Sequence, residues 1–170
     1  MADTIMNAKD TISGAQAQCV VRIPFNVQTG KPLGTTKHTY NFMMATKVEA
    51  KLDKTKVEVP ILGKSGKGNK ATGWKGTGSA SFHYCTSVFR KILEYYKMTG
   101  DDIYFDMIIT NEDKSSAAGV QTTTLIDCNL DGGVLAKLDA NSEVLDEDLN
   151  FTFEDFSIDT PFKNLNGFKQ

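Results

Sequence analysis

Cys85 and His83 are the two side chains of this sequence that come closest to forming a catalytic pair. They lie two positions apart at the end of a segment that alternates polar and apolar residues, so on a β-strand they face the same side. A cysteine nucleophile needs a nearby base, a group that orients this base, and donors for an oxyanion. The neighbouring sequence offers no carboxylate that would orient His83 and no oxyanion hole. We therefore interpret the pair as a packing feature and predict no enzyme activity.

Metal binding finds as little support among the cysteines and histidines. Cys19, Cys85 and Cys128 are widely spaced and odd in number, and His38 lies far from His83. Zinc sites use ligands at short and regular spacings, which this set lacks. We expect reduced and mostly buried thiols in a protein made in a cytosol, with no metal and no cofactor.

Two glycine-rich stretches invite comparison with nucleotide-binding loops. Gly63-Lys64-Ser65 lacks the glycine that a phosphate-binding loop carries five positions before its Gly-Lys pair, because that position is Glu58, and no helix follows. The glycines at 73, 76 and 78 run in the reverse order of the dinucleotide-binding fingerprint and begin a strand. We expect these glycines to mark a bend where two backbones approach closely.

The strongest pattern in the chain is the separation of its charges. Residues 47–75 carry eight lysines and three acids, a net +5, whereas residues 139–159 carry eight acids and no base, a net −8. The formal charge of the whole chain is only −2. Two unlike patches on one molecule suit a head-to-tail interface between identical copies. Exposed ion pairs contribute only about 0–1 kcal/mol each, so the charges should set register more than affinity.

Nucleic-acid binding is a second interpretation of the basic segment. Lysines beside Trp74 could neutralise a phosphate backbone while the indole stacks on a base. Outside residues 47–75, however, the chain carries 11 bases against 18 acids, and aromatic residues do not interleave with the lysines. A nucleic-acid-binding β-barrel is therefore the less favoured alternative.

Alternating apolar residues and frequent turn signals predict a mainly β chain. The expected strands cover residues 19–25, 40–52, 57–61, 77–85, 103–110, 122–130, 134–138 and 149–158. The last strand changes phase at Glu154-Asp155, which predicts a bulge or a bend. One helix is expected at about residues 87–98, with a single apolar face and Gly100 as its terminator. The prediction is one domain, residues 1–170, an antiparallel β-barrel or sandwich with one packed α-helix and a long extended hairpin loop.

Two segments are expected to lie outside the packed body. The first fifteen residues have weak periodicity and indicate an arm that a neighbour could order. Residues 63–73 are glycine and lysine with little to bury, which predicts a mobile loop. No apolar run reaches the about 18 residues of a membrane span, and the polar start of the chain does not resemble a signal peptide. We expect a soluble product with no stable membrane association.

Four segments, in this order, resemble the phage tail tube protein family. They are TISG at residues 11–14, the basic GNKATGWKGTGSASF at residues 68–82, the helix, and LDANSEVLDEDLNFTFEDF at residues 138–156. The members of this family are inner-tube subunits of contractile-tailed phages and of phage-derived bacteriocins of Gram-positive bacteria. The patterns TGxKGTGxAxF and FTFEDF are the most distinctive parts of the resemblance.

The resemblance implies a structural subunit that forms six-fold rings, which stack into a hollow tube surrounded by a tail sheath protein. It implies no enzyme activity and no cofactor. Baseplate and tail terminator proteins would be further partners, and the passage of DNA through the lumen stays open. An N-terminal arm, residues 1–14, and a long basic inter-ring loop, residues 53–72, would reach the next ring. The virion tail or phage-tail-like particle would assemble in the host bacterial cytoplasm.

The charge pattern and the resemblance together predict where copies of the chain contact each other. The expected subunit-interface residues are Thr11, Ile12, Lys54, Lys56, Lys64, Lys67, Lys70, Trp74, Asp146, Glu147, Asp148, Glu154 and Asp155. The inner-tube protein of a related injection machine, such as a type VI secretion system, stays open as an alternative with the same architecture.

Overall fold

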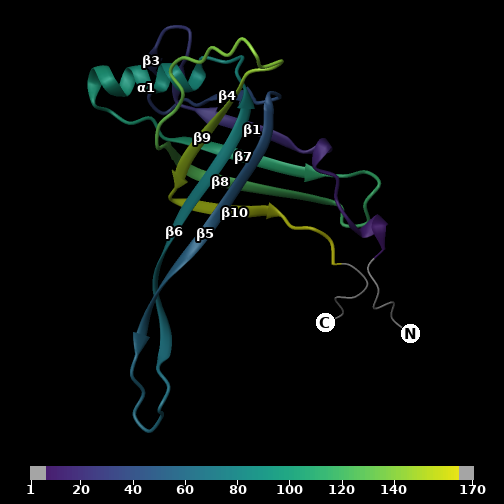
Figure 1. Ribbon diagram of the computed structural model, residues 1–170, viewed down its shortest axis with the longest axis vertical. Coiled ribbons are helices and arrows are strands. Elements are labelled where there is room, and N and C mark those ends of the chain that lie inside the picture. Colours follow the sequence, from purple (N-terminus) through teal and green to yellow (C-terminus); the bar gives the residue numbers. More distant parts are fainter. Residues whose placement is uncertain (1–6, 165–170) are drawn as a thin grey trace.

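The computed structural model describes residues 7–164, which form a β structure with one α-helix (Figure 1). Two short 3₁₀ helices, η1 (Ala8–Asp10) and η2 (Gly14–Gln16), precede the first strand. The α-helix is α1 (Val88–Thr99). The strands are β1 (Gln18–Ile23), β2 (Phe25–Asn26), β3 (Lys31–Pro32), β4 (His38–Asn41), β5 (Ala45–Val59), β6 (Gly68–His83), β7 (Phe105–Glu112), β8 (Val120–Leu130), β9 (Asp146–Phe153) and β10 (Asp155–Thr160).

One antiparallel sheet contains all strands of this part of the chain except the small β2–β3 ladder. Its order is β4-β1-β7-β8-β9-β6-β5, and β10 pairs with β8. The outermost strands β4 and β5 do not pair with each other, so the sheet stays open instead of closing into a barrel. The prediction of a mainly β fold is confirmed. Of the two predicted forms, a barrel or a sandwich, the structure has the open, sandwich-like form.

The sheet folds into two layers because the chain bends between β9 and β10. β9 pairs with β6 along its whole length, whereas β10 pairs with β8. Glu154 sits at the bend, and its N–H donates to the carbonyl of Ile126 at 3.2 Å. Figure 1 shows the result, with β5 and β6 crossing over β7, β8 and β10, while β9 runs beside β6 to the start of β10. The bend predicted at Glu154-Asp155 is confirmed. It is the corner at which the chain passes from β9 in one layer to β10 in the other.

The hydrophobic core lies between these layers and under α1. Its largest fully buried side chains include Phe25, Phe82, Phe105 and Phe151. The helix adds the buried side chains of Val88, Phe89 and Ile92 on one face. Gly100 ends α1 in the left-handed conformation, with φ of +79°, and its N–H donates to the carbonyl of Tyr96. The predicted helix and its terminator are confirmed, because a glycine adopts this φ without steric cost.

Several expected strand limits are wrong. The expected strand 40–52 is interrupted, because Phe42 turns inward to pack edge-on against Phe82 and Phe89, and the chain passes from β4 to β5. Residues 57–59 belong to β5 and not to a separate strand. Residues 134–138 form no strand, since the carbonyl of Val134 accepts from Arg90 instead of a ladder neighbour.

The glycines at 76 and 78 make room for aromatic rings. On the neighbouring strand, Gly76 lies opposite Phe153 and Gly78 opposite Phe151. A Cβ added to Gly78 would lie 2.3 Å from the Phe151 ring, and one added to Gly76 would lie 2.5 Å from the Phe153 ring. A close approach is therefore present at these glycines. It brings an aromatic ring against a backbone, whereas we expected two backbones to approach each other.

Gly78→Ala is expected to lower the free energy of unfolding by about 1–3 kcal/mol, because the added Cβ would overlap the buried Phe151 ring and force it to shift. Gly73→Ala is the matched control on the same strand, since nothing lies within 4 Å of its added Cβ. Urea unfolding followed by circular dichroism measures both variants. Equal stability of the two would show that the ring is not held against Gly78.

Candidate assembly surfaces

The hairpin of β5 and β6 extends far beyond the body of the molecule (Figure 1). Its register runs from Ala45 opposite Phe82 to Val59 opposite Gly68. Residues 53–72 are exposed, apart from the half-buried Gly68. The segment expected as a loop is thus mostly a regular two-stranded ribbon, and only residues 60–67 form its turn. Backbone pairing explains the difference, because a ladder satisfies the peptide groups even where the side chains bury nothing.

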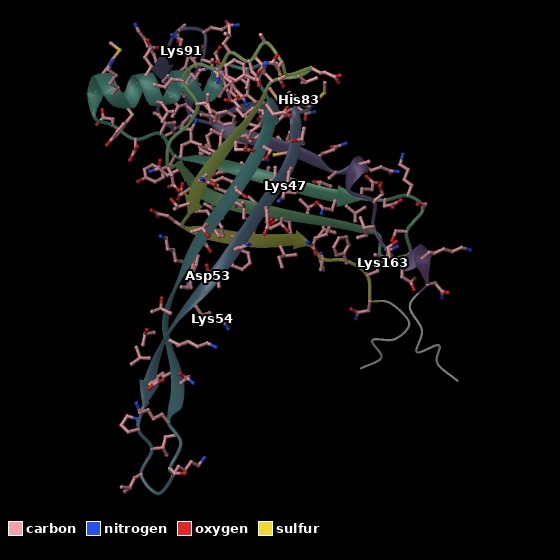
Figure 2. All side chains as sticks on the ribbon, in the orientation of Figure 1. Lys47, Asp53, Lys54, His83, Lys91 and Lys163 are labelled. Carbon is pink, nitrogen blue, oxygen red and sulfur yellow. The ribbon has the colours of Figure 1, made fainter. Side chains whose placement is uncertain are left out.

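The hairpin keeps a positive charge after its internal ion pairs are counted. Lys67 Nζ lies 2.9 Å from Glu58 Oε2 across the ribbon. Nearer the body, hydrogen bonds and charge from Lys51 and then Lys47 lower the pKa of the Glu49 carboxyl. Within residues 7–164 no carboxylate lies at ion-pair distance from the other lysines of the distal ribbon, which are Lys54, Lys56, Lys64 and Lys70. In Figure 2, Lys54 marks the start of this distal part.

The end of the hairpin is apolar as well as basic. Val57, Val59 and Ile61 are exposed, and Leu62 is fully exposed. The turn is held by the N–H of Lys64, which donates to the carbonyl of Ile61 at 3.2 Å. We call residues 57–64 the hairpin tip. An exposed cluster of this kind, at the end of an extension that covers none of its own core, is typical of an interaction site.

Trp74 lies at the base of the hairpin, where the ribbon meets the body. It is 45% exposed, and its ring centroid is 6.4 Å from that of Phe153 and 6.5 Å from that of Phe156. Phe156 is itself exposed. Glu154 and Asp155 are exposed at the adjacent bend. Trp74, Glu154, Asp155 and Phe156 together present an aromatic and acidic surface next to the basic ribbon.

Some carboxylates of the acidic residues 139–159 already have hydrogen-bond partners within their own molecule. Ser81 Oγ donates to Asp148 Oδ1 at 2.6 Å, and Asp146 Oδ1 lies 2.6 Å from His83 Nδ1. Both acids are exposed. They therefore remain candidates for contact with another copy.

Glu147 does not belong to the exposed set that the sequence suggested. Its side chain is fully buried, and its Oε2 accepts from Arg90 Nη1 at 2.8 Å. Arg90 also donates to the carbonyls of Thr86 and Val134, and its guanidinium lies 4.2 Å from the centre of the Tyr84 ring. Glu147 thus stabilises its own fold and offers no charge to a neighbour.

The described part of the N-terminal arm is attached to the loop between β7 and β8. The N–H of Ser13 donates to Asp113 Oδ2 at 2.9 Å, and the N–H of Ala117 donates to the carbonyl of Lys9. Hydrogen bonds from Ser115 and then from the Ser13 N–H lower the pKa of the Asp113 carboxyl. Thr11 is exposed and Ile12 half-buried beside this anchor. Residues 1–6 of the expected arm lie outside the described residues.

The candidate chemical groups are not gathered into a site. Burial raises the pKa of the Cys19 thiol to about 11 and that of the Cys128 thiol to about 12, which removes their nucleophilic character. A carboxylate does lie next to His83, contrary to expectation, because β6 and β9 pair there and bring Asp146 opposite it. Both side chains are about half exposed. Neither of them, nor Cys85, lines the two shallow hollows that the surface has around Asp131 and Asn150.

Metal ligands and membrane-spanning helices can be assessed in the same part of the chain. Within residues 7–164, no three histidine, cysteine or acidic side chains come close enough to hold a metal ion. Across those residues, no helix has both the length and the apolar character needed to span a bilayer.

Two solved assemblies contain chains with this fold. A chain in the anti-feeding prophage cap, the AFP tube terminating cap, matches with a TM-score of 0.62 and 11% identity over 94% of this chain and 99% of that chain. A chain in the PVC sheath-tube complex of an extracellular contractile injection system matches with a TM-score of 0.55 and 9% identity, over 89% and 93%. This chain therefore shares its fold with chains found in these assemblies.

The sequence assigns the family. The family described as phage tail tube protein matches residues 4–159, and the chain belongs to it. A relative from Bacillus subtilis (strain 168), the phage-like element PBSX protein XkdM, is 43% identical over 110 residues, 65% of this chain and 75% of that protein. The resemblance seen in the sequence is confirmed, and the protein is a component of a phage tail or tail-like particle.

Proposed function

We propose that this protein forms six-membered rings that stack into the hollow inner tube of a contractile phage tail or a phage-derived bacteriocin. The observation that carries the proposal is the extended hairpin, whose distal half buries nothing in its own chain. An isolated two-stranded ribbon is only marginally stable in water. A contact with another copy would supply the burial that the ribbon lacks.

The open sheet supports the sideways contacts of a ring. Its outermost strands, β4 and β5, each have one edge without a ladder partner in the described chain. β5 is 15 residues long, and a long free edge is a template for uncontrolled pairing. Closure of a ring through these edges would remove that hazard. The resulting contact is heterologous, and a rotation that closes gives a ring of defined size.

The proposed partners follow from the same assembly. A sheath protein would surround the tube, and baseplate and terminator proteins would contact its two ends. The tube would conduct DNA in a virion, whereas in a headless bacteriocin it would serve to puncture a membrane. Assembly would take place in the host bacterial cytoplasm. Electron microscopy of the purified protein tests the proposal, with stacked rings expected; protein that stays monomeric at every concentration and salt tested, and is absent from tail-like particles, would contradict it.

Replacing Lys64, Lys67 and Lys70 together by Glu is expected to impair stacking while leaving the monomer folded, because these side chains are exposed and far from the core. Sedimentation of assembled tubes measures stacking, and circular dichroism measures folding. The control changes three exposed lysines away from the hairpin, Lys31, Lys97 and Lys114, to Glu, which gives the same change in net charge. Wild-type sedimentation of the hairpin variant would show that its charge does not act in assembly.

A further inference from the structure

The segment between β8 and β9 presents a second exposed apolar cluster. Leu135, Leu138 and Val144 are all exposed, Leu138 by 94%. We call residues 134–145 the upper segment. It carries Asp139 and Glu143, both exposed, and its one lysine, Lys137, donates to the carbonyl of Asp146.

This segment is fixed at its ends and free in its middle. At one end the carbonyl of Val134 accepts from Arg90, and at the other the N–H of Tyr84 donates to the carbonyl of Leu145 at 2.8 Å. Between these anchors, apart from the bond from Lys137 to Asp146, the hydrogen bonds are local ones, such as that from the N–H of Asn141 to Asp139 Oδ1. The apolar side chains are therefore held at a defined place while little of their own chain covers them.

An acidic hollow adjoins the upper segment at Val134. It is lined by Asp131, Gly132, Gly133, Val134, Asp148 and Asn150. It therefore offers two carboxylates at the start of the upper segment.

The hairpin tip and the upper segment lie at opposite ends of the molecule. Figure 1 shows the tip at one end of the longest axis and the yellow-green upper segment beside α1 at the other. The two cannot meet within one chain. They can meet when two copies stack in the same orientation, which is a head-to-tail contact that extends into a filament.

The two surfaces are alike in apolar character, and the ribbon behind the tip is opposite in charge to the upper segment. The tip combines four exposed aliphatic side chains with Lys64, and its Glu58 pairs with Lys67. The ribbon adds Lys54, Lys56 and Lys70, whereas the upper segment combines three exposed aliphatic side chains with Asp139 and Glu143. Residues 53–59 of β5 alone span about 23 Å at about 3.3 Å per residue, and they are exposed, so the tip projects well beyond the body of its own subunit. We propose that the hairpin tip of one copy docks on the upper segment of a copy in the next ring. This inference rests on the proposed function and names the receiving surface for the hairpin.

Disulfide trapping between two singly substituted proteins tests the docking. Leu62→Cys and Leu138→Cys proteins, made with tags of different size and with Cys85→Ser to remove the exposed thiol, are mixed, assembled and oxidised. A mixed disulfide dimer is expected, at a yield well above that from Leu62→Cys with Met98→Cys. Met98 lies on α1 and is also well exposed, by 78% against 94% for Leu138. The inference would be overturned if tubes form but the yield of the mixed dimer does not exceed that of the control. It would also be overturned if Leu62→Cys forms disulfides mainly with itself.

Charge reversal gives a test that needs no added cysteine. Asp139→Lys with Glu143→Lys is expected to lose most of the sedimenting tubes, and Lys56→Glu with Lys64→Glu in the same chain is expected to restore them. Unchanged assembly in the first variant, or no recovery in the combined one, would overturn the docking. If the wild-type protein itself forms no tubes, the proposed function is wrong. If the wild-type protein forms tubes but the variants give either of these two results, the proposed function stands and only the proposed docking surface is wrong.

Discussion

Arg90→Met is expected to lower the free energy of unfolding by about 3–5 kcal/mol, because it leaves the Glu147 carboxylate buried without its partner charge. The Arg90 side chain is 18% exposed and the Glu147 side chain is not exposed at all. Glu147 Oε1 accepts no hydrogen bond from the described residues, so Arg90 carries the stabilisation of this carboxylate through Oε2. Methionine keeps much of the side-chain length on α1 and removes only the charge and its donors.

Two further variants separate the ion pair from packing. Glu147→Leu combined with Arg90→Met should recover most of the lost stability, since a buried pair can often be replaced by apolar residues at little cost. Lys91→Met is the matched control on the same helix, because the Lys91–Glu94 pair is exposed and its loss should change stability by no more than about 0.5 kcal/mol. Urea unfolding measures all three. A loss below about 1 kcal/mol for Arg90→Met would contradict the assigned role.

The sequence contained a signal for the burial of Glu147 that its negative neighbours concealed. Positions 147, 149, 151 and 153 alternate on one face of β9, and the last three are apolar and buried. The period of two therefore predicts that Glu147 points inward. A block of acids suggests instead a solvated surface. Nothing in the sequence identified Arg90 as the partner, since the pairing depends on how α1 lies against the sheet.

The fold class could be predicted because local patterns determine it. The phase change at Glu154 located the corner between the layers, and Gly100 located the end of α1. The strand order could not be predicted, because it depends on pairings between segments far apart in the chain. Residues 68–73 of the ribbon were mistaken for part of a mobile loop for a related reason, since they have little to bury and are ordered by cross-strand hydrogen bonds.

The candidate assembly surfaces were predicted in part. The exposed lysines of the hairpin and the acids at the bend were visible as blocks of charge. Val57, Val59 and Ile61 of the hairpin tip were assigned to an ordinary strand, and Leu135 and Leu138 of the upper segment to a strand that does not form. Only their exposure at opposite ends of the molecule shows that these residues are available to another copy.

Replacing residues 55–73 by Asn-Gly is expected to abolish tube formation and to leave a folded monomer. The replacement keeps the cross-strand pair of Lys54 and Trp74 and closes it with a two-residue turn that favours a hairpin. Trp74 stays in place against Phe153 and Phe156. The removed residues are exposed apart from Gly68, and an isolated ribbon has a stability near zero, so the free energy of unfolding should change by no more than about 1 kcal/mol.

Mixing experiments with the shortened protein separate stacking from ring formation. Its sheet edges at β4 and in the proximal part of β5 are intact, so it should still join rings with wild-type subunits. A ring that contains shortened subunits lacks some of its tips and should stack poorly on the next one. Electron microscopy of mixtures should then show tubes that become shorter as the fraction of shortened protein rises. Tubes of normal length formed by the shortened protein alone would mean that the hairpin does not connect rings, and assembly would have to depend on the body of the subunit.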